Sequence, residues 1–557
     1  MEENKKKNRI KFHIIAIFFI IIFCISIAPK YLQNDTFYTI KVGEYISQNG
    51  IGNLRMDPFS WHELPYTFPH WLYDLIIYTI YSIGGMAGIY GSTMFFTAIL
   101  GCSIYLTSNK ISKNAPISLI ITLVAMNLMK PYLAARAQLV TFSLMTLTIF
   151  LIEKYLEKPD KKHAALLILM SLAIVNLHMA VWPFFFVLFI PYIVEYFISK
   201  NIITIDLVLK IKIKLERIWK KDNYEKRILE LEEKIKHNEI KRKEIREHPY
   251  KIRVTINDNM KKLILVMIVC MFMGAITPTG MTTPYTYLYK TVTGNTMKVI
   301  NEHLPLDLSL NMDFVAFFLF FNILLTFIDI KIDLKHLCYY LGILHLSLNA
   351  RRQVSMFLVI CTPILVKMIA DIFERYAPEL QDKLINFVNN FFAKVILSTA
   401  VILIAIVNFK PKINEAYYSN DDYPIYASQW IKENLDYKNI HLFNEYNYGS
   451  YLLYQGIPVM IDSRCDLYTP QYNTKTGNPR DGQDIFMDVQ NVATNSADYK
   501  EIFEKYGITH IITYSDSNLS KKLKNDSDYI KLYPLTVEEQ QKDDRFLVYE
   551  KVLENEE

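Results

Sequence analysis

The sequence predicts a polytopic α-helical membrane protein with an α/β domain at its C-terminal end. Hydrophobic residues make up 51% of the 557 residues and occur in repeated apolar runs separated by polar loops. The 38 Tyr and 33 Phe fit a membrane protein, because amphipathic rings collect at membrane–water interfaces. After Lys410 the long apolar runs stop, and short helix-like and strand-like pieces alternate, as in a small α/β domain.

The N-terminal segment Met1–Lys11 is basic and lies directly before the apolar run Phe12–Ala28. Cleaved signal peptides and retained signal anchors both have this pattern. Ser26-Ile27-Ala28 is a poor small-x-small cleavage site and Pro29 follows it, which favours an anchor with its N-terminus in the cytoplasm. The segment 29–85 is then an outer loop.

A short apolar piece, His70–Ile83, ends at Gly84-Gly85. Whether this piece crosses the membrane decides on which side of the membrane each later loop lies. If it crosses the membrane, Lys110, Lys113 and the basic insert after Ile198 fall outside. If it lies flat or re-enters on the outer face, nearly every basic cluster falls on the cytoplasmic side, as the positive-inside bias prefers. We therefore expect this piece to be juxtamembrane.

With that choice the chain makes about eleven crossings. Several are shorter than the roughly 20 residues of a full span, so their boundaries are weak. The expected crossings are Phe12–Ala28, Met86–Thr107, Ile117–Met129, Leu139–Ile152, Ala164–Leu177, Val181–Ile198, Leu263–Ile276, Phe314–Phe327, Leu337–Leu348, Val354–Ile369 and Phe392–Val407.

Four regions follow from this organisation. They are the N-terminal transmembrane half 1–199 with its outer loop 29–85, the basic cytoplasmic insert 200–262, the C-terminal transmembrane half 263–409, and the extracytoplasmic domain 410–557. In the insert, Ile228, Leu231 and Ile235 recur at helical spacing among alternating charges, which predicts one or two charged helices. A solvated cytoplasmic spacer is the favoured interpretation, and a partner coiled coil or a clamp for anionic lipid is the alternative.

The C-terminal domain is expected to contain eight regular pieces and has no Gly-rich phosphate loop. These pieces are Tyr426–Asn434, Ile440–Asn444, Tyr448–Tyr454, Val459–Asp462, Tyr499–Tyr506, Thr509–Tyr514, Leu519–Lys524 and Phe546–Val552. Only Cys465 of the six cysteines lies in a soluble region, so no disulfide framework or cysteine-based metal site is indicated.

The topology chosen above also places polar residues from distant segments of the chain together on the outer face of the membrane. Singly, each loop arginine is more typical of a headgroup anchor. Together they bring carboxylates, which can accept a proton from a hydroxyl, to guanidiniums, which suit phosphate. These residues are Asp35, Asp57, His70, Asp74, Arg136, Asn176, His178, Glu302, His303, Arg351 and Arg352.

Several stretches resemble the GT-C superfamily of multi-spanning glycosyltransferases, and more narrowly a poorly characterised bacterial branch of it. The matching text is NDTFYTIKVGEYISQNG, MDPFSW, HWLYD, ARAQLVTF, NLH, ITPTG, NARRQ and YNYGSYLLYQGIPVMIDSRCDLY. The resemblance covers most of the chain apart from the basic insert. It implies a bacterial cell-membrane enzyme that moves a sugar, with inversion, from a polyprenyl-phosphate carrier to a cell-envelope glycan, lipid or protein.

In such enzymes an acidic residue just after the first transmembrane helix is the proposed base, and Asp35 occupies that position. Asp74 or Asp57 would assist or bind a cation, and Arg136, Arg351 or Arg352 would hold the leaving phosphate. The Asp-Glu or Asp-Asp pair common in the superfamily is Asp35-Thr36 here, which leaves the base and metal dependence open. A divalent cation is compatible with these carboxylates, and the sequence requires no cofactor.

Polar residues at the ends of the strand-like pieces form a second candidate set, because α/β sheets tend to place ligand sites there. Capping and turn roles are an equal alternative for this set, which comprises Asn444, Tyr448, Asp462, Arg464 and Asp466. Membrane lipids are expected partners and nucleic acid is not. The rival function is a non-enzymatic envelope-assembly scaffold or transporter with a degenerate GT-C fold. A transporter should show paired repeats with ionisable groups at mid-membrane, and no such repeat is found in the sequence.

Overall fold

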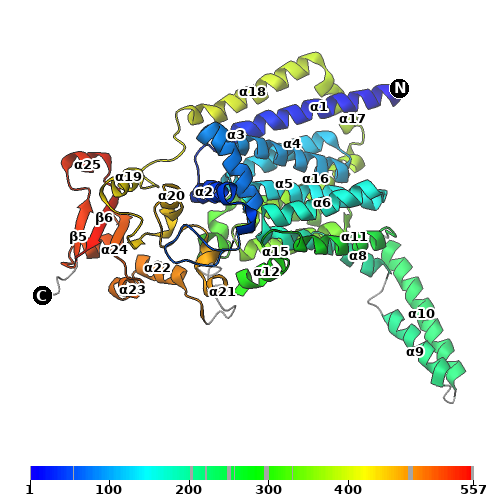
Figure 1. Ribbon diagram of the computed structural model, residues 1–557. Helices are drawn as coiled ribbons and strands as arrows, with labels where there is room; N and C mark the ends of the chain where they lie inside the picture. Colours follow the sequence, from blue (N-terminus) through cyan, green and yellow to red (C-terminus); the bar gives the residue numbers. More distant parts are fainter. Residues whose placement is uncertain are drawn as a thin grey trace.

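The protein is a bundle of helices that carries a small β-sheet at one end and a helical hairpin at the other (Figure 1). The computed structural model describes residues 2–53, 55–200, 205–219, 223–247, 252–255, 257–293, 300–328, 330–474 and 481–552. Residues 201–204 and 248–251 of the predicted insert and 294–299 of a predicted outer loop lie outside these ranges.

Every apolar run that was predicted to cross the membrane overlaps a helix of the bundle. The bundle helices are α1 (Glu2–Ile27), α3 (Trp71–Ser112), α4 (Ala115–Leu128), α5 (Ala137–Glu157), α6 (Lys161–Leu177), α7 (Trp182–Val187), α8 (Ile190–Lys200), α11 (Met260–Phe272), α14 (Met312–Phe327), α15 (Leu334–Asn349), α16 (Gln353–Tyr376), α17 (Leu380–Asn389) and α18 (Phe391–Ile413).

Six helical segments among the described residues are long and apolar enough to cross a membrane: α1, α3, α5, Met179–Ser199, α16 and α18. The five other predicted crossings lie on α4, α6, α11, α14 and α15, which have 13 to 17 residues. At about 1.5 Å per residue these span roughly 20–26 Å, less than the ~30 Å of a hydrocarbon core. The chain is therefore a multi-pass membrane protein, and the count of eleven stays a prediction.

Local sequence signals explain several helix boundaries. The Asn114 side chain accepts a hydrogen bond from the Ile117 amide at the start of α4. Asp160 accepts one from the His163 amide, 2.7 Å away, at the start of α6. Inside α3, Gly85 has φ 57° and ψ −148°, a conformation that glycine adopts without a steric penalty. The helix is kinked there, where the sequence predicted a break after the short apolar piece.

The C-terminal segment forms a mixed four-stranded sheet in the order β3-β4-β6-β5, in which only β3 and β4 are parallel. Its elements are α19 (Ile425–Asn434), β3 (Leu442–Phe443), α20 (Gly449–Tyr454), α21 (Pro470–Asn473), α22 (Ile485–Ala493), α23 (Tyr499–Tyr506), β4 (His510–Tyr514), α24 (Asn518–Leu523), β5 (Tyr529–Tyr533), α25 (Val537–Lys542) and β6 (Phe546–Lys551). The expected strand Val459–Asp462 is absent from this sheet. Val459 instead makes an isolated bridge to Ser60, so the first loop takes its backbone hydrogen bonds.

The first loop and the C-terminal segment share one hydrophobic core, separate from the core of the bundle. Phe37 lies on α2 (Asn34–Asn49), is fully buried, and meets Tyr451 of α20 edge to face at 5.1 Å between ring centroids. Gly43 of α2 lies so close to α3 that an added Cβ would be 2.1 Å from the Asp74 carbonyl oxygen. These contacts lock the first loop between the bundle and the sheet.

A buried ion pair fastens the same junction. Arg464 donates through Nη1 to Asp57 Oδ1 at 2.7 Å, and through Nη2 and Nε to Asp462 at 2.6 and 2.9 Å. The Tyr468 hydroxyl donates to Asp462, and the Ser60 amide donates to Asp57. The three charged side chains are 3% exposed or less. We call Asp57, Asp462 and Arg464 the clasp.

We expect that replacing the arginine of the clasp strongly destabilises the folded protein. Arg464→Ala leaves two carboxylates buried without a counter-charge, and removing one partner of such a group typically costs about 3–5 kcal/mol. Thermal unfolding of the purified protein and limited proteolysis at the junction would measure this loss. Arg545→Ala is the matched control, because Arg545 pairs with Asp516 at an exposed position, where such a pair contributes about 0–1 kcal/mol. Equal effects of the two substitutions would contradict the role assigned to the clasp.

Candidate active site

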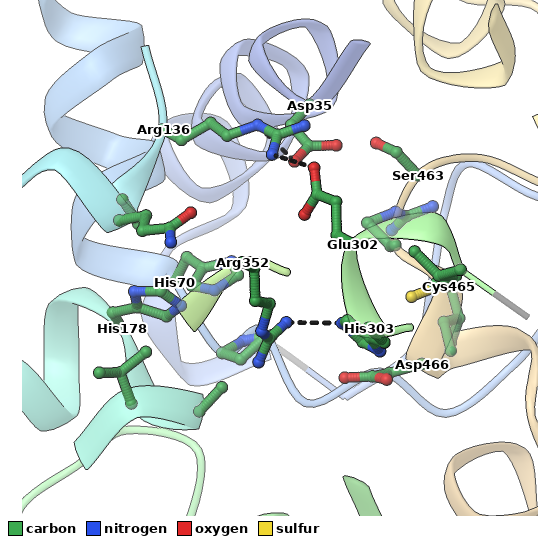
Figure 2. A pocket seen from close by; sticks show the side chains of 18 of the residues that line it. Asp35, His70, Arg136, His178, Glu302, His303, Arg352, Ser463, Cys465 and Asp466 are labelled. Carbon is green, nitrogen blue, oxygen red and sulfur yellow. Dashed lines mark hydrogen bonds and ion pairs between the residues drawn. The ribbon is translucent and has the colours of Figure 1, made fainter. Parts of the chain in front are cut away.

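A cavity of about 910 Å³ lies where the bundle, the first loop and the C-terminal segment meet. Its lining comes from stretches that are far apart in the sequence. Most of it belongs to the start of α2, the loop before α3, the start of α5, the turn after α6, the loop at 300–303, the start of α16 and residues 463–467. Figure 2 shows side chains around the cavity and labels ten of them.

Arg136 lies between two carboxylates on one wall of the cavity. Its Nε is 2.9 Å from Asp35 Oδ2, and its Nη1 is 3.3 Å from Glu302 Oε1 (Figure 2). Asp35 is in the first turn of α2, and Arg136 directly precedes α5. Burial opposes the charge of the guanidinium, but Asp35 and then Glu302 outweigh it and raise the pKa of Arg136. Asp35 remains 25% exposed, so its carboxylate is accessible from the cavity.

A second guanidinium lies across the cavity from this group (Figure 2). Arg352 Nη1 donates to His303 Nε2 at 2.7 Å, and both side chains line the cavity. The adjacent Arg351 does not line it. Its Nε donates to the Pro305 carbonyl at 3.2 Å, and it also bonds the Asn301 side chain. The two neighbouring arginines, both predicted from the sequence to face the site, therefore differ in the structure: only Arg352 lines the cavity.

Two histidines, His70 and His178, also line the cavity. The rings of His70 and His178 meet edge to face at 4.7 Å. Thr141 lies 2.9 Å from His178 Nδ1 and Tyr38 lies 3.4 Å from His70 Nδ1. Burial lowers the pKa of His70 to about 4. Burial, followed by His70 and Arg352, lowers the pKa of His178 well below its usual value. Both imidazoles are therefore neutral at pH 7.

Besides Arg351, three predicted site residues, Asp57, Asp74 and Asn176, lie outside the cavity lining. Asp57 belongs to the clasp, and Asp74 is fully buried in the first turn of α3. Asn176 accepts a hydrogen bond from Trp71 Nε1 at 3.0 Å and donates to the Leu172 and Ile276 carbonyls. Its contacts join α3, α6 and the turn after α11, which is a structural role.

The second candidate set, at the ends of the strand-like pieces, divides in the same way. Asn444 bonds the backbone of Met460 and Ile461, and the Tyr448 hydroxyl donates to the Ile512 carbonyl, so both hold the C-terminal segment together. Asp466 lines the cavity and accepts a hydrogen bond from the Tyr287 hydroxyl at 2.8 Å. Burial raises the pKa of Asp466, and the Tyr287 hydrogen bond and Arg352 oppose this.

Sequence reasoning missed the aromatic and uncharged part of the lining. Its members carry no charge and stand in segments rich in the same residue types, so no sequence signal distinguished them. They include Tyr38, Tyr66, Thr141, Tyr287, Tyr446, Ser463, Cys465 and Tyr472.

Within the described ranges, no group of three or more His, Cys, Asp and Glu side chains is arranged to hold a metal ion. Asp35 and Glu302 both lie in the cavity wall, and the guanidinium of Arg136 bridges them. In this arrangement Arg136 supplies the positive charge that both carboxylates need.

Comparisons with known proteins identify the fold. No family model and no curated protein matches the chain. Among solved structures, the archaeal oligosaccharyltransferase AglB from Archaeoglobus fulgidus, in complex with an inhibitory peptide and a dolichol-phosphate, matches with a TM-score of 0.51 and 11% identity. The match covers 94% of this chain and 73% of that chain. A second structure of the Archaeoglobus fulgidus enzyme, tethered to an acceptor peptide containing the NVT sequon, has the same coverage, 10% identity and a TM-score of 0.48.

At 11% identity the likeness concerns the fold, and it extends over nearly the whole chain. The GT-C resemblance predicted from the sequence is thereby confirmed at the level of the fold.

Because His70 is buried and neutral, we expect the folded protein to lose stability as the pH falls. Between about pH 6.5 and pH 4 the unfolded chain binds protons that His70 does not bind in the folded state, so stability falls as the pH drops through this window. The loss is about 1.4 kcal/mol for each unit by which the pKa is lowered. Thermal unfolding at about pH 7.5 and pH 5 should show it, and His70→Gln should reduce the difference. His237→Gln, at an exposed position, should leave it unchanged. An unaltered difference in His70→Gln would contradict this origin.

Proposed function

We propose that the protein is an integral membrane glycosyltransferase that moves a sugar from a polyprenyl-phosphate carrier to a cell-envelope acceptor. One observation carries the proposal. In a chain with this fold, a single cavity holds an accessible carboxylate, Asp35, across from a guanidinium, Arg352. Transfer from a lipid phosphate needs both a proton acceptor for the attacking hydroxyl and a partner for the departing phosphate.

Asp35 is the base in this scheme. The acceptor oxygen attacks the anomeric carbon, its proton passes to an Asp35 oxygen, and the bond from that carbon to the phosphate oxygen breaks. A single displacement of this kind inverts the anomeric centre. The Arg136 Nε at 2.9 Å fixes the position of this carboxylate. Glu302 on the other side of Arg136 keeps the guanidinium in place.

Arg352 is the phosphate partner. Arginine presents donors in a planar fork that matches two phosphate oxygens, and the hydrogen bond to His303 fixes the orientation of this fork. The neutral His70 and His178 lie in the lining between Arg352 and the carboxylates. A neutral imidazole adds no charge that would compete with Arg352, and it can still donate a hydrogen bond to a sugar hydroxyl.

The distribution of basic residues supports an outward-facing cavity. Lys5 and Arg9 pair with Asp382 at the end of the bundle away from the sheet, and Lys110 pairs with Glu157 at the end of α5 away from the cavity. The positive-inside bias assigns that end to the cytoplasm. The cavity, the first loop and the C-terminal segment then face the envelope of a bacterial cell, where a cell-surface acceptor is available.

The base assignment is tested by Asp35→Asn, which keeps the shape of the side chain and removes its ability to accept the proton. Turnover with a panel of labelled polyprenyl-phosphate sugars should fall roughly 100-fold or more, while donor binding survives. Asp313→Asn is the matched control, since Asp313 also lies in the first turn of a helix but outside this cavity. Full turnover by Asp35→Asn would contradict the assignment of Asp35 as the base, and no turnover by the wild-type protein would favour a non-enzymatic scaffold.

A further inference from the structure

The helical hairpin formed by α9 (Ile205–Trp219) and α10 (Tyr224–Glu247) has no part in the proposed reaction. We call it the arm. It leaves the bundle at the end opposite the C-terminal sheet and extends obliquely to one side (Figure 1). The two helices pack on each other, but the arm has one more apolar face than this packing needs.

The inner face of the arm is complete in itself. Leu209 and Ile213 of α9 are buried, with 7% and 8% of their surface exposed, although they lie far from the bundle core. Ile228, Leu231 and Ile235 of α10 are half-buried at the spacing that the sequence predicted. Two ion pairs also join the helices, Arg217 with Glu232 at 3.2 Å and Arg227 with Glu216 at 3.5 Å.

The outer face of α9 is apolar and exposed. Ile211, Leu215 and Ile218 are 50%, 44% and 64% exposed. Their spacing of four and three residues places them in one stripe, on the side of the helix away from Leu209 and Ile213. Lys210, Lys212 and Lys214 are exposed on either side of this stripe. The face therefore combines an apolar stripe with flanking charges of one sign.

The root of the arm is fixed to the bundle close to the membrane. Helix α9 begins six residues after Ser199, the last residue of a segment that can cross the membrane. On the return, β1 (Ile252–Arg253) pairs in parallel with β2 (Ile332–Asp333), and Arg253 forms an ion pair with Asp333. The Thr255 hydroxyl donates to Glu195 Oε2 of α8 at 2.9 Å. Both ends of the arm thus lie next to residues anchored at the end of a segment that can cross the membrane.

We propose that α9 binds the anionic lipid surface of the leaflet at this end of the bundle. Its stripe would enter the boundary between headgroups and acyl chains, and its lysines would reach lipid phosphates. Each lysine near an anionic surface adds to the electrostatic attraction. The flanking charges decide against pairing of α9 with a second copy of itself, because lysines beside both apolar seams would repel each other. This inference is independent of the glycosyltransferase proposal.

The test uses the full-length protein in lipid nanodiscs. A thiol-reactive fluorophore on Leu215→Cys reports contact with lipid through quenching by brominated acyl chains. The parent chain, labelled in parallel, supplies the background from the six native cysteines. In discs containing an anionic phospholipid, quenching at this site should be at least about twofold stronger than at Glu233→Cys, an exposed position on α10. In discs of neutral lipid alone the difference should shrink.

Replacing Lys210, Lys212 and Lys214 by Glu in the labelled protein should remove the quenching and leave the melting temperature unchanged. Equal quenching at positions 215 and 233, or quenching that survives the three Glu substitutions, would overturn the proposal. Disulfide-linked dimers through Leu215→Cys in place of lipid quenching would overturn it in favour of a protein partner.

Discussion

The burial of the Arg464 guanidinium between two carboxylates is the constraint on which the candidate active site depends. Asp57 comes from the first loop and Asp462 from the C-terminal segment, 405 residues later, and the clasp is almost inaccessible to water. Such a group stabilises a fold only when all its members are present. The neighbours of Arg464, Ser463 and Cys465, line the cavity, so the clasp sets the position of that wall.

Much of the fold could be predicted because hydrophobic runs report helices directly. The break at Gly85, the helix Ile425–Asn434 and the strand His510–Tyr514 lie within two residues of their predicted places. The strand expected at Val459 fails because its backbone pairs with the first loop, a contact between segments some 400 residues apart. The shared core of loop and sheet could not be predicted for the same reason. Local patterns describe single elements, while this core consists of contacts between distant ones.

For the site, the order of the crossings predicted only which residues lie at the same end of the bundle. Counting crossings brought Asp35 and Arg136 to the same end of the bundle, and the structure places them 2.9 Å apart. The order of the crossings does not predict the directions in which neighbouring side chains point. Arg351 and Arg352 are adjacent, and only the position around the start of α16 directs one into the cavity and the other to the loop at 301–305. Likewise, the sequence does not show the partner of a carboxylate in a loop, which is why Asp57 was expected to assist Asp35 and not to pair with Arg464.

Binding of a labelled polyprenyl-phosphate sugar to the purified protein tests whether this cavity holds the lipid-phosphate donor. Arg352→Ala should weaken this binding by about tenfold or more, equivalent to about 1.4 kcal/mol. Arg352→Lys should restore little of the lost affinity. Arg351→Ala, one residue away and outside the cavity, should change the affinity by less than about twofold. Equal losses in Arg351→Ala and Arg352→Ala, or no loss in Arg352→Ala, would contradict the account.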